Sequence, residues 1–245
     1  MDARVPKVRI FWGLAAPVAL GFMALVLARP ALAVDGVIEI NQARATAGNI
    51  TPGDAPGFPV FINVPGSYRL TSNLSVAAGF NAIIVNVDDV TIDLNGFNIS
   101  GGGGAIADGV GFGAQQNAEV RNGTIRGFSR HGVFASGFSN GISLIGLRLI
   151  GNAISGAELQ GLGNLVDRCT ARNNLGVGIR ALGGSLVINS VARGNTGVGL
   201  YLDQNGGYGS NVLTGNNGGD ANPQVGGTGA FQLGSNVCGS DLVCP

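Results

Sequence analysis

The chain has 245 residues, of which 45% are apolar and 11% are charged, with fourteen basic and fourteen acidic residues. Zero net formal charge is not typical of nucleic-acid-binding proteins, so we expect no nucleic-acid partner. Val, Ile, Leu and Phe recur throughout, which excludes a disordered chain and provides a core for one domain.

The N-terminal segment, residues 1–33, has the composition of a secretory signal peptide. Three basic residues precede an apolar run over residues 10–28, and Ala31-Leu32-Ala33 matches the small-residue pattern at which such peptides are cleaved. We therefore expect a secreted or periplasmic protein from which this segment is removed. Because the apolar run is long for a signal peptide, an uncleaved membrane anchor is the alternative. No later apolar stretch is long enough to span a membrane.

The next segment predicts the start of a β-rich fold. Residues 34–59 are rich in Gly, Pro and Ala, and we interpret them as an N-terminal leader or cap. Short strands are expected at residues 61–64 and 68–74, with a turn at Pro65-Gly66 between them. A stack of strands that begins here needs a cap, because its first strand has unpaired backbone groups.

A repeat with a period of about 21 to 24 residues follows, over positions 60–220. Four copies of one short segment begin at almost even intervals, at Arg148, Thr170, Val191 and Val212. A further copy begins one period earlier, at Thr124, and a weaker one at Val90. Each copy has short β-rich pieces between Gly and Asn, which predicts strands stacked coil upon coil about 4.8 Å apart. A leucine-rich repeat has a similar period, but its leucine motif is absent.

Equivalent positions of the copies form columns. Two columns are apolar and are expected to point into the core: Ile125, Leu149, Ala171, Ala192 and Leu213 in one, and Val133, Ala157, Ile179 and Leu200 in the other. A third column consists of Asn152, Asn174, Asn195 and Asn216. Asparagines stacked at a turn are expected to bond their amides from coil to coil.

With these columns, the chain resembles members of the pectate-lyase-like superfamily of right-handed parallel β-helices. The aligned asparagines resemble the asparagine ladder of that superfamily. Residues 58–74 also resemble the opening segment of secreted, uncharacterised β-helix proteins. The resemblance implies an all-β, single-stranded, right-handed parallel β-helix of about six to eight coils. It implies no single activity, because members include lyases, hydrolases, epimerases and non-catalytic proteins.

Two segments depart from the repeat. If Leu94 is equivalent to Ile125, the two are separated by clearly more than one period, so residues 101–116 are expected to form a flexible surface loop on one enlarged coil. Residues 221–245 are expected to be a C-terminal cap.

The chain has only three cysteines, which are expected to meet an oxidising compartment if the protein is secreted. Cys238 and Cys244 have five residues between them, and we expect a disulfide that closes a small loop. Cys169 is left over and is interpreted as a buried, inert thiol. Three cysteines with this spacing do not suit a metal site.

One outward face is the candidate site. Strand alternation points Asp89 and Asp93 outward. The repeat alignment continues their face to four arginines on successive coils: Arg126, Arg148, Arg172 and Arg193. Arginine forks pair with carboxylates, so the four arginines are candidate substrate-binding residues for an acidic polysaccharide. Asp89 and Asp93 are candidate Ca²⁺ ligands, which makes Ca²⁺ the one cofactor considered.

Lyases of the resembled superfamily use Ca²⁺-bound substrate and an arginine base. By position, Arg126 or Arg148 would be the analogous catalytic residue. No catalytic motif of the superfamily matches this chain residue by residue, so the resemblance assigns no role, and whether the chain is an enzyme stays open. The alternative is that the same residues form a solvated, salt-bridged face that keeps the stack soluble.

Three further residues bear on the site. His131 is the only histidine and aligns with Ser155 and Val177 in a column expected to point inward, which predicts a buried, hydrogen-bonded side chain. Glu158 and Arg180 align on neighbouring coils and are expected to form an ion pair.

Two functions follow from these observations. The first is a secreted β-helix protein that binds or acts on an acidic extracellular polysaccharide, as a polysaccharide lyase or related enzyme if it is catalytic. The second is a non-catalytic extracellular scaffold or surface-interaction protein, whose partner is on a cell surface. The oligomeric state is not predicted.

Overall fold

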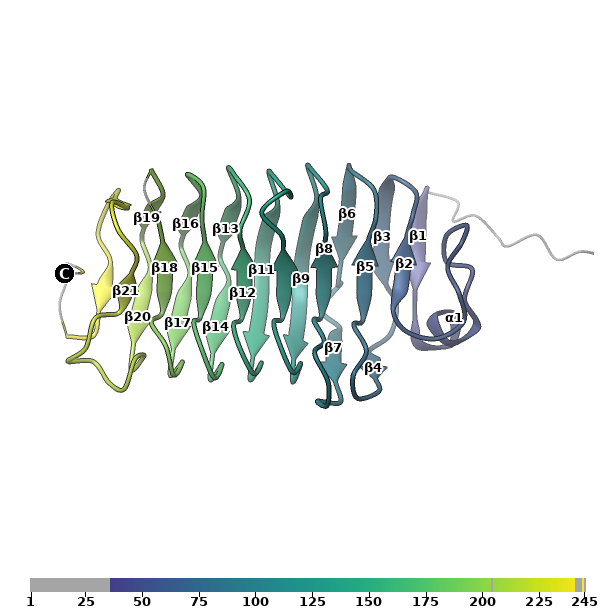
Figure 1. Cartoon of the computed structure of the whole chain (residues 1–245), viewed down its shortest axis with the longest axis horizontal. Helices are drawn as coiled ribbons and strands as arrows, with labels where there is room; N and C mark the ends of the chain where they lie inside the picture. The colour runs from purple at the N-terminus through teal and green to yellow at the C-terminus, as the bar shows by residue number, and fades with distance from the viewer. Residues whose placement is uncertain (1–35, 204, 241–243, 245) are drawn as a thin grey trace, which may run out of the picture. The chain divides into compact units, whose positions relative to one another are not determined.

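A computed structural model describes residues 36–203, 205–240 and 244, so the predicted signal peptide lies outside the described residues. Short strands stack coil upon coil into a solenoid, and the pairings between them are parallel (Figure 1). This confirms the predicted parallel β-helix. The described part of the chain has no helix long and apolar enough to cross a membrane.

A complete coil contributes strands to three rows, which we number in chain order. Row 1 contains β1 (Val37–Ile40), β3 (Gly66–Leu70), β6 (Val90–Asp93), β9 (Glu119–Arg126), β11 (Ser143–Ile150), β13 (Leu165–Asp167), β16 (Leu186–Ile188), β19 (Gly207–Gly209) and β22 (Phe231–Gln232). Row 2 contains β4 (Leu74–Val76), β7 (Asn98–Gly101), the C-terminal parts of β9 and β11, β14 (Thr170–Arg172), β17 (Val191–Arg193), β20 (Val212–Thr214) and β23 (Val237–Cys238).

Row 3 is a separate sheet of eight strands among the described residues. It contains β2 (Val60–Ile62), β5 (Ile83–Val85), β8 (Val110–Phe112), β10 (Val133–Ala135), β12 (Ala157–Leu159), β15 (Ile179–Ala181), β18 (Leu200–Leu202) and β21 (Val225–Gly226). One strand of row 3 per coil agrees with the predicted six to eight coils.

Rows 1 and 2 are joined through a bend in the backbone. Residues at this bend adopt the left-handed conformation, with φ of 62° at Gly146, 53° at Arg168 and 52° at Asn189. Glycine and asparagine tolerate this conformation, which explains their recurrence there, whereas arginine rarely adopts it. The Arg168 guanidinium lies 3.1 Å from the Asp167 carboxylate.

The predicted columns are confirmed. Ile125, Leu149 and Ala171 pair in register in row 2, and Val133, Ala157 and Ile179 pair in register in row 3. All members of both columns are fully buried. The core is therefore a set of apolar columns that run along the stack.

The asparagine ladder is also confirmed. Asn152, Asn174 and Asn195 each donate from Nδ2 to the side-chain oxygen of the next asparagine, at 3.1, 2.9 and 2.8 Å. Asn216 ends the ladder by donating to Gln224 Oε1 at 2.9 Å. The side chains also accept backbone N–H bonds, so buried polar groups of the turn are satisfied.

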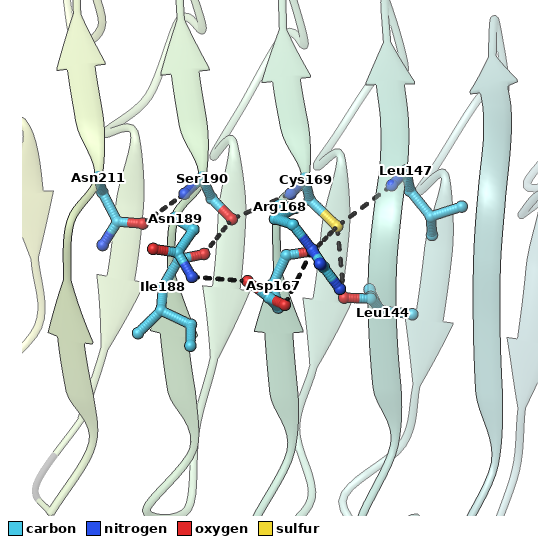
Figure 2. Close-up of polar contacts among 9 residues, drawn as sticks. All are labelled: Leu144, Leu147, Asp167, Arg168, Cys169, Ile188, Asn189, Ser190 and Asn211. Carbon is cyan, nitrogen blue, oxygen red and sulfur yellow. Dashed lines mark hydrogen bonds and ion pairs between the residues drawn. The ribbon is translucent and has the colours of Figure 1, made fainter.

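A second polar column lies at the bend between rows 1 and 2 and was not predicted (Figure 2). The Cys169 backbone N–H donates to Ser190 Oγ at 3.1 Å, and the Ser190 N–H donates to Asn211 Oδ1 at 2.9 Å. Asn211 then donates to Asn236 Oδ1 at 3.1 Å. Successive members of the column are 21, 21 and 25 residues apart, close to the period of the repeat, but their different residue types make the column hard to recognise in the sequence. Cys169 is 1% exposed, as predicted, and burial raises the pKa of its thiol to about 12.

Both ends of the described part of the chain contribute strands to the stack. β1 lies within the predicted leader and pairs with β3, and α1 (Gln42–Ala47) lies at the same end of the solenoid (Figure 1). In the predicted C-terminal cap, β21, β22 and β23 pair with the three strands of the preceding coil. Cys238 and Cys244 form a disulfide. The described parts of the predicted caps therefore extend the stack of strands, and their role as caps stays a prediction.

The predicted enlarged loop requires a correction. Ile99, not Leu94, pairs with Ile125, so this coil is only slightly longer than the repeat. β7 and β8 occupy part of residues 101–116. The segment between these two strands is short, and β8 belongs to row 3. The coil appeared enlarged because Leu94, which directly follows the row 1 strand β6, was taken as the equivalent of Ile125 in place of the later residue Ile99.

Candidate functional site

The four predicted arginines lie on the outer side of row 2. Arg126, Arg172 and Arg193 occupy one register line, together with Ile150, which lies between the first two. Arg148 lies on β11, two residues before Ile150. All four side chains are exposed. We call this set the arginine row.

The arginine row has no acidic partner among the described residues. Arg148 Nε donates to Thr124 Oγ1 at 2.9 Å, and Arg126 Nε donates to Ser100 Oγ at 3.1 Å. None of the ion pairs in the described part of the chain includes any of the four arginines. The stack therefore presents several uncompensated cations on neighbouring coils.

The predicted position of Asp93 next to this row is wrong. Asp93 lies in row 1 and pairs in register with Arg121, five residues before Arg126 and on the other side of the bend. The Arg121 guanidinium is 3.2 Å from Asp93 Oδ2, and Asn122 donates to Asp93 Oδ1 at 3.3 Å. The alignment failed because β9 spans both rows, which a single repeat alignment cannot show.

Asp89 also takes part in local structure. It adopts the left-handed backbone conformation, with φ of 57°, and its carboxylate accepts a 3.3 Å bond from Asn117. Among the described residues, no group of three or more His, Cys, Asp or Glu side chains could hold a metal ion. The Ca²⁺ site at Asp89 and Asp93 stays a prediction. Both Asp93 oxygens and one Asp89 oxygen, Oδ1, already accept hydrogen bonds from the protein.

A second constellation lies on the outer side of row 3. The middle residues of four consecutive strands point outward and pair in register: Phe134, Glu158, Arg180 and Tyr201. Arg180 Nη1 lies 2.9 Å from Glu158 Oε1, which confirms the predicted ion pair. The Arg180 guanidinium also lies over the Tyr201 ring, with Cζ 4.9 Å from the ring centre. Arg130 covers the Phe134 ring in the same way at 4.2 Å.

A hollow opens beside this ion pair, and we call it the Glu158 hollow. Its lining residues are Ile154, Ser155, Glu158, Gly176, Val177, Arg180 and Tyr201. They come from the outer positions of row 3 and from the turns that lead into it. The ion pair was predicted from the sequence, whereas the hollow was not.

His131 lies just before β10, which pairs with β12, one of the strands that border the hollow. Its burial was predicted correctly, but its hydrogen bonding was not. It is buried, at 6% exposure, but within the described residues its Nδ1 atom has no hydrogen-bond partner. Its ring stacks on Phe134 with ring centres 5.5 Å apart. Burial, together with the nearby cations Arg130 and Arg180, lowers the pKa of His131 to about 4. The imidazole is therefore neutral at neutral pH.

The column that contains His131 was predicted to point into the core. His131 and Ser155 are buried, at 6% and 2% exposure, but the column also borders the hollow. Ser155 and Val177 occupy this column, and both line the open hollow. The error has a physical reason. Glycines follow these positions, and the chain turns there, so strand alternation does not extend back from β12 and β15.

Comparisons with known proteins support the fold. The family model described as "Right handed beta helix region" matches residues 108–236. Among solved structures, the chain is similar to the A-module of the mannuronan C-5 epimerase AlgE4 from Azotobacter vinelandii, with 11% identity and a TM-score of 0.55. The similarity covers 82% of this chain and 66% of that module. A search of curated proteins found no significant match. Since the family model covers more than half of the sequence, the chain belongs to the right-handed β-helix family.

Proposed function

We propose that the protein is exported and binds an acidic polysaccharide along the arginine row. The observation that carries the proposal is the set of four exposed arginines on neighbouring coils, without acidic partners among the described residues. Strands of adjacent coils are about 4.8 Å apart, so a linear polyanion lying along the row meets guanidinium groups at short, repeated intervals. Each guanidinium offers a fork of donors that matches a carboxylate.

Two further points support a polysaccharide. The similar solved structure is named as an enzyme that acts on mannuronan, so a related fold works on a polysaccharide in at least one other protein. The signal-peptide pattern of residues 1–33 supports export to the compartment where such polymers occur. Arg126 and Arg148 remain the catalytic candidates if the bound polymer is also cleaved.

Binding is tested with purified protein and three immobilised polymers: polygalacturonate, alginate and neutral dextran. The protein should bind the two polyuronates and not dextran, and the binding should weaken with added salt. Arg172→Gln should weaken binding roughly twofold to fivefold, the size expected for one exposed ion pair. Arg69→Gln is the matched control, because Arg69 is an exposed arginine of row 1 and the substitution changes the net charge equally.

The outcomes separate the competing functions. Equal loss of binding in the two variants would indicate a non-specific charge effect and would contradict a site at the arginine row. No binding to either polyuronate would favour the scaffold or surface-interaction protein. A rise in ultraviolet absorbance from unsaturated products during incubation would identify a lyase, and Arg126→Ala or Arg148→Ala should then abolish it.

A further inference from the structure

We propose that the Glu158 hollow is a separate binding site for a neutral sugar ring. The inference does not depend on the arginine row, which lies on row 2, whereas the hollow lies on row 3. Three properties of the hollow carry it: a free oxygen on a buried carboxylate, a balanced pair of charges, and an apolar wall.

Glu158 provides the first property. Its side chain is only 5% exposed, although carboxylates are rarely buried without full satisfaction of their oxygens. Arg180 Nη1 and Gln160 Nε2 both donate to the same oxygen, Oε1, at 2.9 and 3.1 Å. Within the described residues, Oε2 accepts no hydrogen bond, and Glu158 lines the hollow. A hydrogen-bond donor on a ligand in the hollow would satisfy this Oε2 atom.

The charge balance determines which donor fits. Glu158 and Arg180 together have no net charge, so the pair attracts neither an anion nor a cation strongly. Arg180 is 35% exposed at its side chain, and only Nη1 has a partner among the described residues. The hollow therefore offers a carboxylate acceptor next to guanidinium donors. A pair of neighbouring hydroxyls meets both needs, because a hydroxyl donates and accepts, and sugar rings present such pairs.

The wall of the hollow fits the other side of a sugar ring. Ile154 and Val177 provide aliphatic surface, and Ile154 is 45% exposed. Tyr201 and Ser155 also line the hollow. Small-molecule sites typically combine apolar walls with a few placed polar groups, as this hollow does.

The test uses the neutral disaccharides maltose, cellobiose and lactose as probes, with binding followed by nuclear magnetic resonance of the purified protein. We expect saturable shifts with at least one of them. Val177→Trp should abolish these shifts by filling the hollow from a half-buried position. Val198→Trp is the matched control, because Val198 lies in the same Gly-Val-Gly sequence one coil later and does not line the hollow.

Glu158→Gln probes the free oxygen directly. It should weaken binding on the order of tenfold, as expected for the loss of a hydrogen bond to a charged group. Because this change also leaves Arg180 without its ion-pair partner, the thermal midpoint of each variant is measured by circular dichroism. Absence of shifts with all three probes, or an equal loss of binding in Val177→Trp and Val198→Trp, would overturn the proposal. Polyuronate binding of Val177→Trp should be unchanged, which keeps this result distinct from failure of the arginine row.

Discussion

Replacement of Asn195 by alanine should cost more stability than most single substitutions in this chain. Asn195 lies in the interior of the asparagine ladder and is 1% exposed. Its Oδ1 accepts from the backbone N–H and the Nδ2 of Asn174, at 3.0 and 2.9 Å. Its Nδ2 donates to Ala171 O and Asn216 Oδ1, at 3.0 and 2.8 Å. At about 1 kcal/mol for each lost bond, Asn195→Ala should lower the free energy of unfolding by about 4 kcal/mol.

The end of the ladder provides an internal comparison. Asn152 makes two side-chain bonds, from Phe128 N at 3.2 Å and to Asn174 Oδ1 at 3.1 Å. Asn152→Ala should therefore cost about half as much, roughly 2 kcal/mol. Thr196→Ala is the control, because Thr196 is exposed, and surface substitutions usually change stability by less than about 0.5 kcal/mol.

The assay is equilibrium unfolding in urea, followed by circular dichroism for the three variants and the unmodified protein. The expected order of destabilisation is Asn195→Ala, then Asn152→Ala, then Thr196→Ala. If Asn195→Ala costs no more than Thr196→Ala, the ladder satisfies polar groups without stabilising the stack, and the estimate from bond counting is refuted. Each coil is stabilised by its neighbours. A change in the slope of the unfolding free energy against urea concentration would therefore indicate that the coils no longer unfold together.

Three other predictions concern pH, close packing and metal. The pKa of His131 is lowered to about 4 in the folded protein from its ordinary value of 6.5, so the unfolded chain takes up the proton at a higher pH than the folded one. The free energy of unfolding should therefore fall as the pH drops from about 6.5 to about 4. In urea titrations, His131→Phe should reduce that fall. A Cβ on Gly178 would lie 2.5 Å from a backbone oxygen, so Gly178→Ala should cost roughly 2 kcal/mol or more, whereas Gly137→Ala, in open space, should change the thermal midpoint little. The predicted Ca²⁺ site at Asp89 and Asp93 requires that Ca²⁺ raise the thermal midpoint, that EDTA reverse the rise and that Asp93→Asn abolish it; an unchanged midpoint excludes the site.

The regular part of the repeat was predictable to the residue. From Thr124 to Val212, the near-constant offsets between copies place each strand opposite its correct partner, because the core columns and the asparagine ladder tolerate no change in register. The prediction failed at Asp93, where one coil is longer and β9 spans two rows. Sequence equivalence depends on a constant coil length, and local insertions in a solenoid break that condition without disturbing the stack.

The Glu158 hollow shows a different limit of sequence reasoning. The Glu158–Arg180 pair was predictable because both residues occupy the middle of short strands, where alternation holds. The hollow also depends on Ile154 and Val177, which lie in turns, and the repeat gives no rule for where turn side chains point. His131 was correctly predicted to be buried, but its surroundings could not be predicted for the same reason.

Outward positions of a solenoid differ in what they reveal about function. Inward positions and turn asparagines are constrained by the stack, so their regularity reports folding alone. An exposed arginine without a partner contributes little to the stability of the stack, and Arg172 and Arg193 still occupy equivalent positions on adjacent coils. Glu158 is the opposite case, since its burial costs stability that one ion pair does not fully recover. Both features are difficult to explain by folding, and for that reason they mark the two surfaces where ligands should be sought.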